Sequence, residues 1–200
     1  MSAGSATIQS GGNNTTITQT SDRAVINWNK FSVANGNEII FRQPNTGAAT
    51  LNRVTGNELS TIAGRIQADG SVYIVNPNGI AITATGLVQT GGAFVASSLD
   101  MSDADFQAGR ANFRGKGASA RITNAGSITA GQGAYVALLG GAVTNSGSII
   151  VPQGRLALGS GEQIALDLNG GNFLQVAVPT ALLTNAALVS NSALLPLRAG

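Results

Sequence analysis

A phrase of the sequence recurs after 21 residues, and this repeat limits the possible folds more than any other feature. Residues 122–128 (ITNAGSI) return as residues 143–149 (VTNSGSI), and residues 133–138 (GAYVAL) are echoed 21 positions later by residues 154–158 (GRLAL). Short β-type runs separated by Asn-Gly, Ser-Gly and Gln-Gly fill the period. A period of 21 residues has room for about three short strands and three turns. The sequence therefore predicts an all-β protein that folds as a parallel β-helix, or β-solenoid.

The same repeat predicts which side chains stack, since residues one period apart should lie about 4.8 Å apart on parallel strands. The inward apolar pairs are Ile122 over Val143, Ile128 over Ile149, and Val136 over Ala157 or a near neighbour. Asn124 and Asn145 also occupy equivalent positions. They either stack as a ladder of side-chain amides or serve only as good turn formers, and both interpretations stay open.

Weaker echoes lie on both sides of the repeat. Residues 92–96 (GAFVA) precede residues 133–137 (GAYVA) by 41 positions, close to two periods, and residues 183–185 (LTN) follow residues 143–145 (VTN) by 40. An antiparallel sandwich of short strands is the alternative fold. Hairpins require no recurrence of a whole phrase at a fixed distance, so the repeat favours the solenoid.

The N-terminal third contains β-type segments without the period, namely residues 15–18, 23–33 and 38–42. In the middle segment Ile26 and Trp28 share one face. Phe31 and Val33 lie at odd positions, so in an unbroken strand they would point to the opposite face. A bulge or corner is therefore expected near residues 29–30. The first coil of a solenoid exposes open strand edges, which invite aggregation. Irregular strands and the only Trp near one end therefore indicate a cap.

The chain is long enough for one domain with a substantial core. We expect residues 5–60 to form the cap and first strands, and residues 61–200 to form the coils of the same domain. The start, residues 1–5 (MSAGS), lacks the basic and apolar regions of a secretory signal. No amphipathic cap is visible near residue 200 either. We therefore expect a fragment of a longer protein.

A turn sequence, Asn76-Pro77-Asn78-Gly79, separates two apolar runs, residues 72–75 and 80–82. Pro77 presets φ at the second position, the side chain of Asn76 can bond the backbone ahead, and Gly79 closes a type I turn. The two runs either fold back as a hairpin or follow each other round the corner of a coil.

Composition excludes several kinds of chemistry. The chain contains no Cys and no His, which removes thiol nucleophiles, Ser-His-Asp triads and His-metal sites. Charged residues make up only 10%, against roughly 25% in an ordinary globular protein. The net charge of +2 is a small excess on a weakly charged chain, so we expect no nucleic-acid partner.

One acidic cluster could carry chemistry. It consists of Asp100, Asp103 and Asp105, followed by the basic residues Arg110, Arg114 and Lys116. β-Helix enzymes that act on polysaccharides use such carboxylates for calcium binding or acid–base work. The simpler interpretation is a solvated loop with a short helix over residues 102–109, in which Ser102 is the N-cap and Asp105 lies three residues on. We favour the simpler interpretation.

Aromatic side chains could stack on sugars, but packing in the core or the cap is the more frequent use of such residues. The candidates are Trp28, Phe31, Phe41, Phe94, Phe106, Phe113, Tyr135 and Phe173. A module that binds glycans directly through them is therefore kept as an alternative function.

Six segments follow one another along the chain, namely residues 24–33 (AVINWNKFSV), 51–56 (LNRVTG), 62–80 (IAGRIQADGSVYIVNPNGI), 92–100 (GAFVASSLD), 113–115 (FRG) and 122–128 (ITNAGSI). In this order they resemble the two-partner secretion domain of filamentous-haemagglutinin-type exoproteins. The resemblance covers roughly residues 5–178. The Asn-Pro-Asn-Gly-Ile element alone is a weak signal, but it is specific in this order and beside these neighbours.

The resemblance implies a right-handed parallel β-helix with an N-terminal cap and a small extra-helical sheet. It also implies export through a cognate outer-membrane β-barrel transporter with periplasmic POTRA domains. The residues to which it assigns transporter recognition or folding are Asn76, Pro77, Asn78, Gly79 and Ile80, together with Asn52, Arg53 and Val54. A second Asn-Pro-Asn element of some relatives matches Gln43-Pro44-Asn45 poorly, so no role is transferred there.

We therefore expect a monomeric, non-enzymatic secretion and folding domain of a large, adhesin-type exoprotein, without a cofactor. It would be secreted or displayed at the cell surface through the periplasm of a Gram-negative bacterium, with its signal peptide outside this chain. Host surfaces or glycans would be contacted through the full-length protein. The alternatives are a carbohydrate-active β-helix enzyme and a glycan-binding adhesin module.

Overall fold

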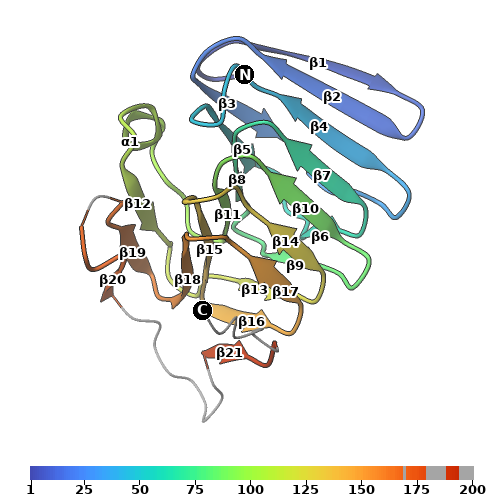
Figure 1. Ribbon diagram of the computed structural model, residues 1–200. Coiled ribbons are helices and arrows are strands. Elements are labelled where there is room, and N and C mark those ends of the chain that lie inside the picture. The colour runs from blue at the N-terminus through green and yellow to red at the C-terminus, as the bar shows by residue number, and fades with distance from the viewer. Residues whose placement is uncertain (169, 179–187, 194–200) are drawn as a thin grey trace.

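The computed structural model describes residues 1–168, 170–178 and 188–193 of the chain. Strands stack along one axis and form three sheets that wind as a β-solenoid (Figure 1). Sheet 1 has the order β1 (Ala6–Gly11), β2 (Asn14–Gln19), β4 (Glu38–Arg42), β7 (Arg65–Ala68), β10 (Leu87–Thr90), β14 (Ser127–Thr129) and β17 (Ser148–Ile150). Sheet 2 has the order β3 (Arg23–Trp28), β5 (Ala49–Val54), β8 (Ser71–Val75), β11 (Phe94–Ser97), β15 (Tyr135–Gly140) and β18 (Arg155–Ser160). Sheet 3 has the order β6 (Ser60–Ile62), β9 (Ile80–Ile82), β13 (Arg121–Asn124), β16 (Ala142–Asn145) and β21 (Val189–Asn191).

All strand pairs of these three sheets are parallel except β1 with β2. The solenoid predicted from the repeat is thus confirmed. Ile122 lies opposite Val143 and Ile128 opposite Ile149, as expected. Val136 lies opposite Leu156, the near neighbour of the expected Ala157.

The interpretation of the echo at residues 92–96 as two periods is wrong. β11 and β15 are direct neighbours, with Phe94 opposite Val136, so only one coil separates these positions. That coil is long because it contains an excursion with the helix α1 (Asp103–Gln107) and the strand β12 (Ala111–Arg114). The echo at residues 183–185 lies outside the described residues.

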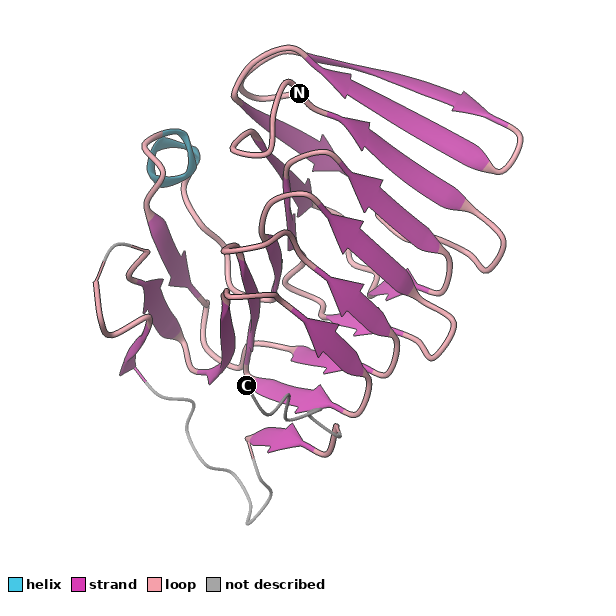
Figure 2. Ribbon diagram, viewed as in Figure 1, coloured by secondary structure: helices cyan, strands magenta, loops and turns pink. Residues whose placement is uncertain are grey.

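A fourth, antiparallel sheet on the flank of the solenoid has the order β12, β19 (Gln163–Leu166) and β20 (Leu174–Val178). It is the small extra-helical sheet that was expected. Figure 2 shows the one short helix of the described residues beside this sheet. No helix in this part of the chain has the length and apolar character needed to span a membrane.

The parallel ladders begin earlier than the expected start of the coils at residue 61. β2 already pairs with β4, and β3 pairs with β5. The antiparallel strand β1 covers the edge of β2 at the N-terminal end (Figure 1). The expected corner near residues 29–30 is present, since β3 ends at Trp28 and Val33 forms a parallel bridge with Ile62 of sheet 3.

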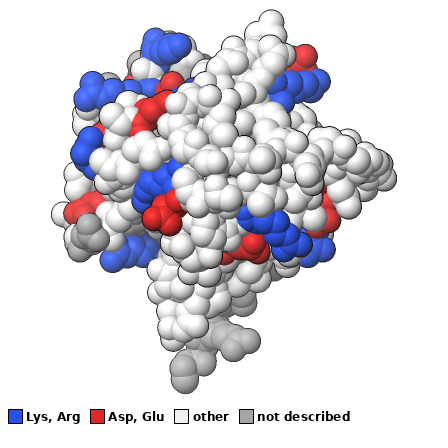
Figure 3. All heavy atoms as spheres, turned by 90° about the horizontal axis from the view of Figure 1, so that it is seen from above, with Lys and Arg blue, Asp and Glu red and all other residues white. Residues whose placement is uncertain are grey.

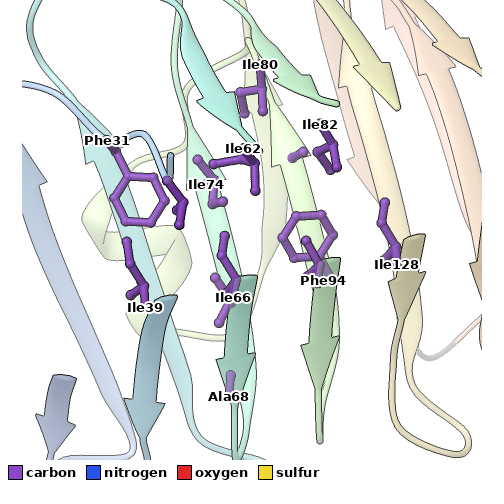
Figure 4. Packing of buried hydrophobic residues seen from close by; sticks show 14 of the residues in the cluster. Phe31, Ile39, Ile62, Ile66, Ala68, Ile74, Ile80, Ile82, Phe94 and Ile128 are labelled. Atoms are coloured by element: carbon purple, nitrogen blue, oxygen red, sulfur yellow. The ribbon is translucent and has the colours of Figure 1, made fainter. Parts of the chain in front are cut away.

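Two hydrophobic cores lie on opposite faces of sheet 2. The inner core fills the solenoid and consists mostly of aliphatic residues with a few Phe side chains, including Phe31, Ile62, Ile66, Ile74, Ile80, Phe94 and Ile128 (Figure 4). The outer core lies between sheet 2 and the flanking α1, β12 and β19, and includes Leu51, Tyr73, Val75, Leu99, Phe106, Phe113 and Ile164. Consecutive residues of β8 therefore enter different cores, which explains the unbroken apolar run of this strand.

A column of glycines at one corner explains why the repeated phrase contains Gly. Gly126 and Gly147 follow β13 and β16. A Cβ on Gly126 would lie 2.4 Å from the carbonyl oxygen of Gly86, and one on Gly147 would lie 2.1 Å from that of Gly126. The coils approach too closely here for any side chain, so the corner spacing requires glycine.

Candidate functional site

The turn at residues 76–79 is a corner of a coil. It leads from β8 of sheet 2 to β9 of sheet 3, so the chain keeps its direction of winding and does not form a hairpin. The amide of Gly79 donates to the carbonyl oxygen of Asn76 over 2.9 Å, which closes the turn. Gly79 has a φ of +101° and is buried, so a side chain at this position would be strained.

Asn76 is fully buried and binds the coil before it. Its Nδ2 donates to the carbonyl oxygen of Glu58 and to Oγ of Ser60, both over 2.9 Å. Its Oδ1 accepts from the amide of Asn78 over 2.9 Å. Because its side-chain amide bonds backbone groups of two coils and the buried hydroxyl of Ser60, Asn76 acts as a structural tie.

The surface of the corner is formed by other residues. Pro77 and Asn78 are exposed, although Nδ2 of Asn78 also donates to the carbonyl oxygen of Gly56 over 2.9 Å. Leu59 lies beside Gly79 and is 46% exposed. A partner that meets the folded domain could therefore touch Pro77, Asn78 and Leu59, whereas Asn76 and Ile80 are hidden.

The structure brings the second predicted segment next to this corner, because β5 and β8 are neighbours in sheet 2. Asn52 is buried, and its Oδ1 accepts from Nε1 of Trp28 over 3.0 Å. Its Nδ2 donates to the carbonyl oxygen of Tyr73 over 3.3 Å. Val54 is buried in the inner core. Both residues thus connect neighbouring coils.

Arg53 points to the opposite face of sheet 2 and holds the excursion. Its Nε donates to Oδ1 of Asp100 over 2.9 Å, its Nη1 to Oδ1 of Asp103 over 2.7 Å, and its Nη2 to the carbonyl oxygen of Met101 over 2.6 Å. Its side chain is only 16% exposed. Burial alone would raise the pKa of Asp103, but hydrogen bonds from Arg53 and Ser2 and the charge of the guanidinium outweigh it and lower that pKa.

The third carboxylate of the acidic cluster is also engaged. The expected helix is present, and the amide of Asp105 donates to Oγ of its N-cap, Ser102, over 3.0 Å. The carboxylate of Asp105 accepts from Nε of Arg110 over 2.7 Å. The hydrogen bonds from Arg110 and Ser102, together with the charge of Arg110, lower the pKa of Asp105. The capped helix is thus as expected, whereas the hold of Arg53 on Asp100 and Asp103 was not part of the interpretation from the sequence.

A hollow of about 550 Å³ lies over this cluster and is lined by Arg53, Asp100, Met101, Ser102, Asp103, Asp105, Asn112 and Arg114. Its carboxylates already share the guanidinium groups of Arg53 and Arg110. Within residues 1–168, 170–178 and 188–193, no group of three or more carboxylate, His or Cys side chains could hold a metal ion. The hollow thus offers no free carboxylate pair for acid–base chemistry.

The aromatic residues are packed in the cores. Five of them are at most 2% exposed, namely Phe31, Phe41, Phe94, Phe106 and Phe113. Trp28 packs against the inner core, and Tyr135 and Phe173 pack against the outer core. The hydroxyl groups of Tyr73 and Tyr135 bond to each other. None of these rings forms an open platform for a sugar.

Asn124 and Asn145 lie opposite each other, and Nδ2 of Asn124 donates to Oδ1 of Asn145 over 2.8 Å. Nδ2 of Asn145 in turn donates to Oδ1 of Asn191 over 2.9 Å. The side-chain amides thus form a ladder. Asn191 escaped the sequence analysis because it follows Asn145 by 46 positions and not by one period.

Gln43 is a structural tie that the sequence analysis missed. It is buried, and its Oε1 accepts from the amide of Gly70 over 2.7 Å. Its Nε2 donates to the carbonyl oxygen of Ser71 and to Oγ1 of Thr50, both over 3.0 Å. It joins coils as Asn76 does. An amide side chain directly before a proline at a corner is the signal that the two positions share.

Three kinds of comparison with known proteins find similarities to this chain. The family profile described as "TPS secretion domain" matches residues 2–197. Two heme/hemopexin-binding proteins of Haemophilus influenzae are 36% identical over 94 residues and 41% identical over 86 residues, which is 47% and 43% of this chain. The crystal structure of the HMW1 secretion domain from Haemophilus influenzae matches with a TM-score of 0.79 and 33% identity over 90% of this chain.

The matched regions are small parts of these relatives. They cover 10% and 9% of the two heme/hemopexin-binding proteins and 48% of the solved HMW1 chain. The profile nevertheless spans nearly the whole of the present chain, and the solenoid agrees with a solved secretion domain. The chain belongs to the two-partner secretion (TPS) domain family.

Proposed function

We propose that this chain is the secretion and folding domain of a large exoprotein, and that a cognate outer-membrane transporter with POTRA domains recognises it in the periplasm. Export would bring the exoprotein to the surface of a Gram-negative bacterium or into the medium. The match of the family profile to residues 2–197 is the observation that carries this proposal.

The contacts at the corner support a division of labour between its residues. Asn76 joins two coils through buried hydrogen bonds, so its main role is in folding. Pro77 and Asn78, with Leu59 beside them, supply the surface that a transporter would meet on a folded domain. A transporter that binds the extended chain would reach every residue of the motif, largely through backbone pairing.

Stacking of the coils supplies a driving force for export. Each new coil buries its inward side chains against the coil before it, and apolar burial contributes about 1.5–3 kcal/mol for each large side chain. Folding outside the cell would therefore oppose backward sliding. The domain needs no chemical step for this role, so we propose that it is not an enzyme.

The alternative functions have less support. A carbohydrate-active enzyme would need free carboxylates, but Asp100 and Asp103 bind Arg53 and Asp105 binds Arg110. A glycan-binding module would need exposed rings, but most aromatic side chains are buried. The names of two relatives mention heme and hemopexin, but the matched regions are only 10% and 9% of those proteins, so the names do not support a heme site in this chain.

Secretion of single variants with the cognate transporter tests the proposal, together with circular dichroism and thermal melting of each purified chain. Asn76→Ala should lower both the melting temperature and secretion. Leu59→Ser should reduce secretion without a change in melting temperature, if the transporter touches the folded corner. Leu87→Ser is the matched control, since Leu87 is also 46% exposed but lies in sheet 1.

Direct binding of the isolated POTRA domains to folded chain and to urea-unfolded chain distinguishes the two modes of recognition. Binding only to the unfolded chain would assign recognition to the extended state and remove the role of the Leu59 surface. Absence of binding to both forms would contradict recognition by the transporter altogether.

A further inference from the structure

We infer that residues 98–120, here called the strap, staple the first coil of the solenoid to the coil that ends in β18, so that the coils between them open as one unit. A plain solenoid is a row of coils in which each coil contacts only its neighbours, and its end coils open first. The strap leaves the solenoid after β11, crosses the outer face of sheet 2 and returns at β13. It therefore contacts coils that do not contact one another.

One end of the strap reaches the N-terminal coil. Oδ2 of Asp103 accepts from Oγ of Ser2 over 2.9 Å, while Arg53 of β5 holds its Oδ1. The guanidinium of Arg23, in β3, lies 5.3 Å from the centre of the Phe106 ring. β3 is the terminal strand of sheet 2 at this end. Its outward side chains are thus covered by a segment some eighty residues later in the chain.

The other end of the strap is held by the segment that follows β18. β12 pairs with β19, and Phe113 lies opposite Ile164. The carboxylate of Glu162 accepts from the amide and Oγ of Ser119 over 2.8 and 2.7 Å, and from the amide of Gly117 over 3.1 Å. Glu162 lies between β19, which begins at the next residue, and β18, which ends two residues earlier and is the terminal strand of sheet 2 at the opposite end in the described residues.

Detachment of the strap from the solenoid should cost a large part of the folding free energy. Five apolar side chains of the strap are at most 4% exposed, namely Leu99, Met101, Phe106, Ala111 and Phe113. Detachment would expose these five and the outer face of sheet 2 as well, including Tyr73 and Val75. Opening the strap therefore removes most of the outer core. Because the strap covers the end coils, their amides should be as well protected against hydrogen exchange as those of the central coils.

Native-state hydrogen exchange of the whole chain tests this inference. In the wild-type protein, the amides of the terminal strands β3 and β18 should share one opening free energy with those of the central strand β8. A gradient of protection, with β3 or β18 opening well before β8, would overturn the staple, because this is how an unstapled solenoid frays.

Arg53→Met releases the N-terminal end of the strap. Protection of β3 should then fall roughly ten- to hundredfold below that of β8, since hydrogen bonds to charged groups contribute about 1.5–3 kcal/mol. Arg65→Met is the matched control, because Arg65 pairs with Glu38 across 3.3 Å in sheet 1, away from the strap. The inference would be contradicted if Arg53→Met lowered the protection of β3 and β8 equally. It would also be contradicted if Arg65→Met lowered the protection of β3 as much as Arg53→Met does.

Glu162→Gln gives an independent test at the other end, which also covers the possibility that Arg53→Met fails to fold. It should lower the protection of β18 relative to β8 and leave β3 unchanged. Unchanged protection of β18 would remove the proposed hold at this end. The measurement involves no transporter, so its result is separate from the test of export.

Discussion

The inner and outer cores share sheet 2 but are built from different kinds of sequence. The inner core repeats, since each coil places aliphatic side chains over those of the coil before, as in the column of Ile66, Val88 and Ile128. The outer core combines segments that are distant in the chain, from Val25 to Leu166. The repeat adds one coil to the next with the same contacts, whereas the strap occurs once and its contacts belong to this particular stretch.

The polar groups of the two cores differ in the same way. Inside the solenoid the buried polar residues are neutral, and they connect neighbouring coils; examples are Asn52, Asn76, Asn124 and Asn145. At the rim of the outer core the polar contacts carry charge, with Arg53 on two carboxylates and Glu162 on two amides. Seen from the N-terminal end, charged side chains form small clusters on a largely uncharged surface (Figure 3). The two cores should therefore respond differently to mutation and to pH.

The largest effects should come from emptying either core. Phe94→Ala in the inner core and Phe113→Ala in the outer core should each cost about 3–5 kcal/mol, because both rings are at most 1% exposed. Urea unfolding measures the loss. A cost below ~1 kcal/mol for Phe113→Ala would show that the outer core is only a loose cover.

Removal of a neutral tie should have an intermediate effect. Asn76→Ala leaves the carbonyl oxygen of Glu58 and the amide of Asn78 without their partner, which should cost about 2–3 kcal/mol. Asn78→Ala removes an exposed bond to Gly56 and should cost less than ~1 kcal/mol. Thermal melting of both variants compares them, and equal costs would contradict the division between hidden and exposed residues of the corner.

Acid should weaken the outer core before the inner core. Hydrogen bonds lower the pKa of Glu162 against the opposing effect of its burial, as they do for Asp103. A carboxyl group whose pKa is lowered on folding stabilises the folded state above its unfolded pKa, and this stabilisation disappears as the pH falls through the lowered value. Urea midpoints should therefore fall as the pH drops below the ordinary carboxyl values of 4.5 and 3.8.

Hydrogen exchange locates this acid effect. The loss of protection at low pH should be concentrated in β12, β19 and the strap. Glu162→Gln should reduce the pH dependence, because it removes one of the groups that titrate. A loss that is larger in β4, β7 and β10 than in these segments would instead place the acid-sensitive groups in the coils.

The smallest effect should come from ion pairs on the outside of the coils. Lys30→Met breaks the pair with Glu58, whose two side chains are 56% and 59% exposed. Such pairs contribute roughly 0–1 kcal/mol because water and salt screen them. A larger loss in thermal melting would show that this pair has a structural role comparable with that of Arg53.

Particular residues show how far the sequence alone could predict the fold. The recurrence of ITNAGSI predicted both the coil and its register, because parallel stacking repeats the same environment at Ile122 and Val143. The Ser102 N-cap was predictable too, since a cap depends on neighbours within one turn. The pairing of Phe113 with Ile164 was not predictable, because antiparallel strands fifty residues apart share no repeated phrase.

The corner at residues 76–79 shows what local sequence can predict and what needs the contacts of the fold. Local turn chemistry identified the turn, but a hairpin and a coil corner have the same four residues. Only the neighbouring coil decided between them, through the bonds from Asn76 to Glu58 and Ser60. Likewise, the apolar run of β8 indicated burial without showing that two separate cores cover it.

Contacts between near neighbours and contacts that repeat were readable in the sequence, and they predicted the β-solenoid, its period and the turn at its corner. The tertiary structure alone decided which coil carries the long excursion, that Arg53 holds this excursion to the outer face of sheet 2, and which part of the corner is exposed. This difference arises because a periodic contact joins residues of the same type at a fixed spacing, so the sequence shows it as a repeat. A contact made once between distant residues leaves no pattern until the folded backbone brings them together.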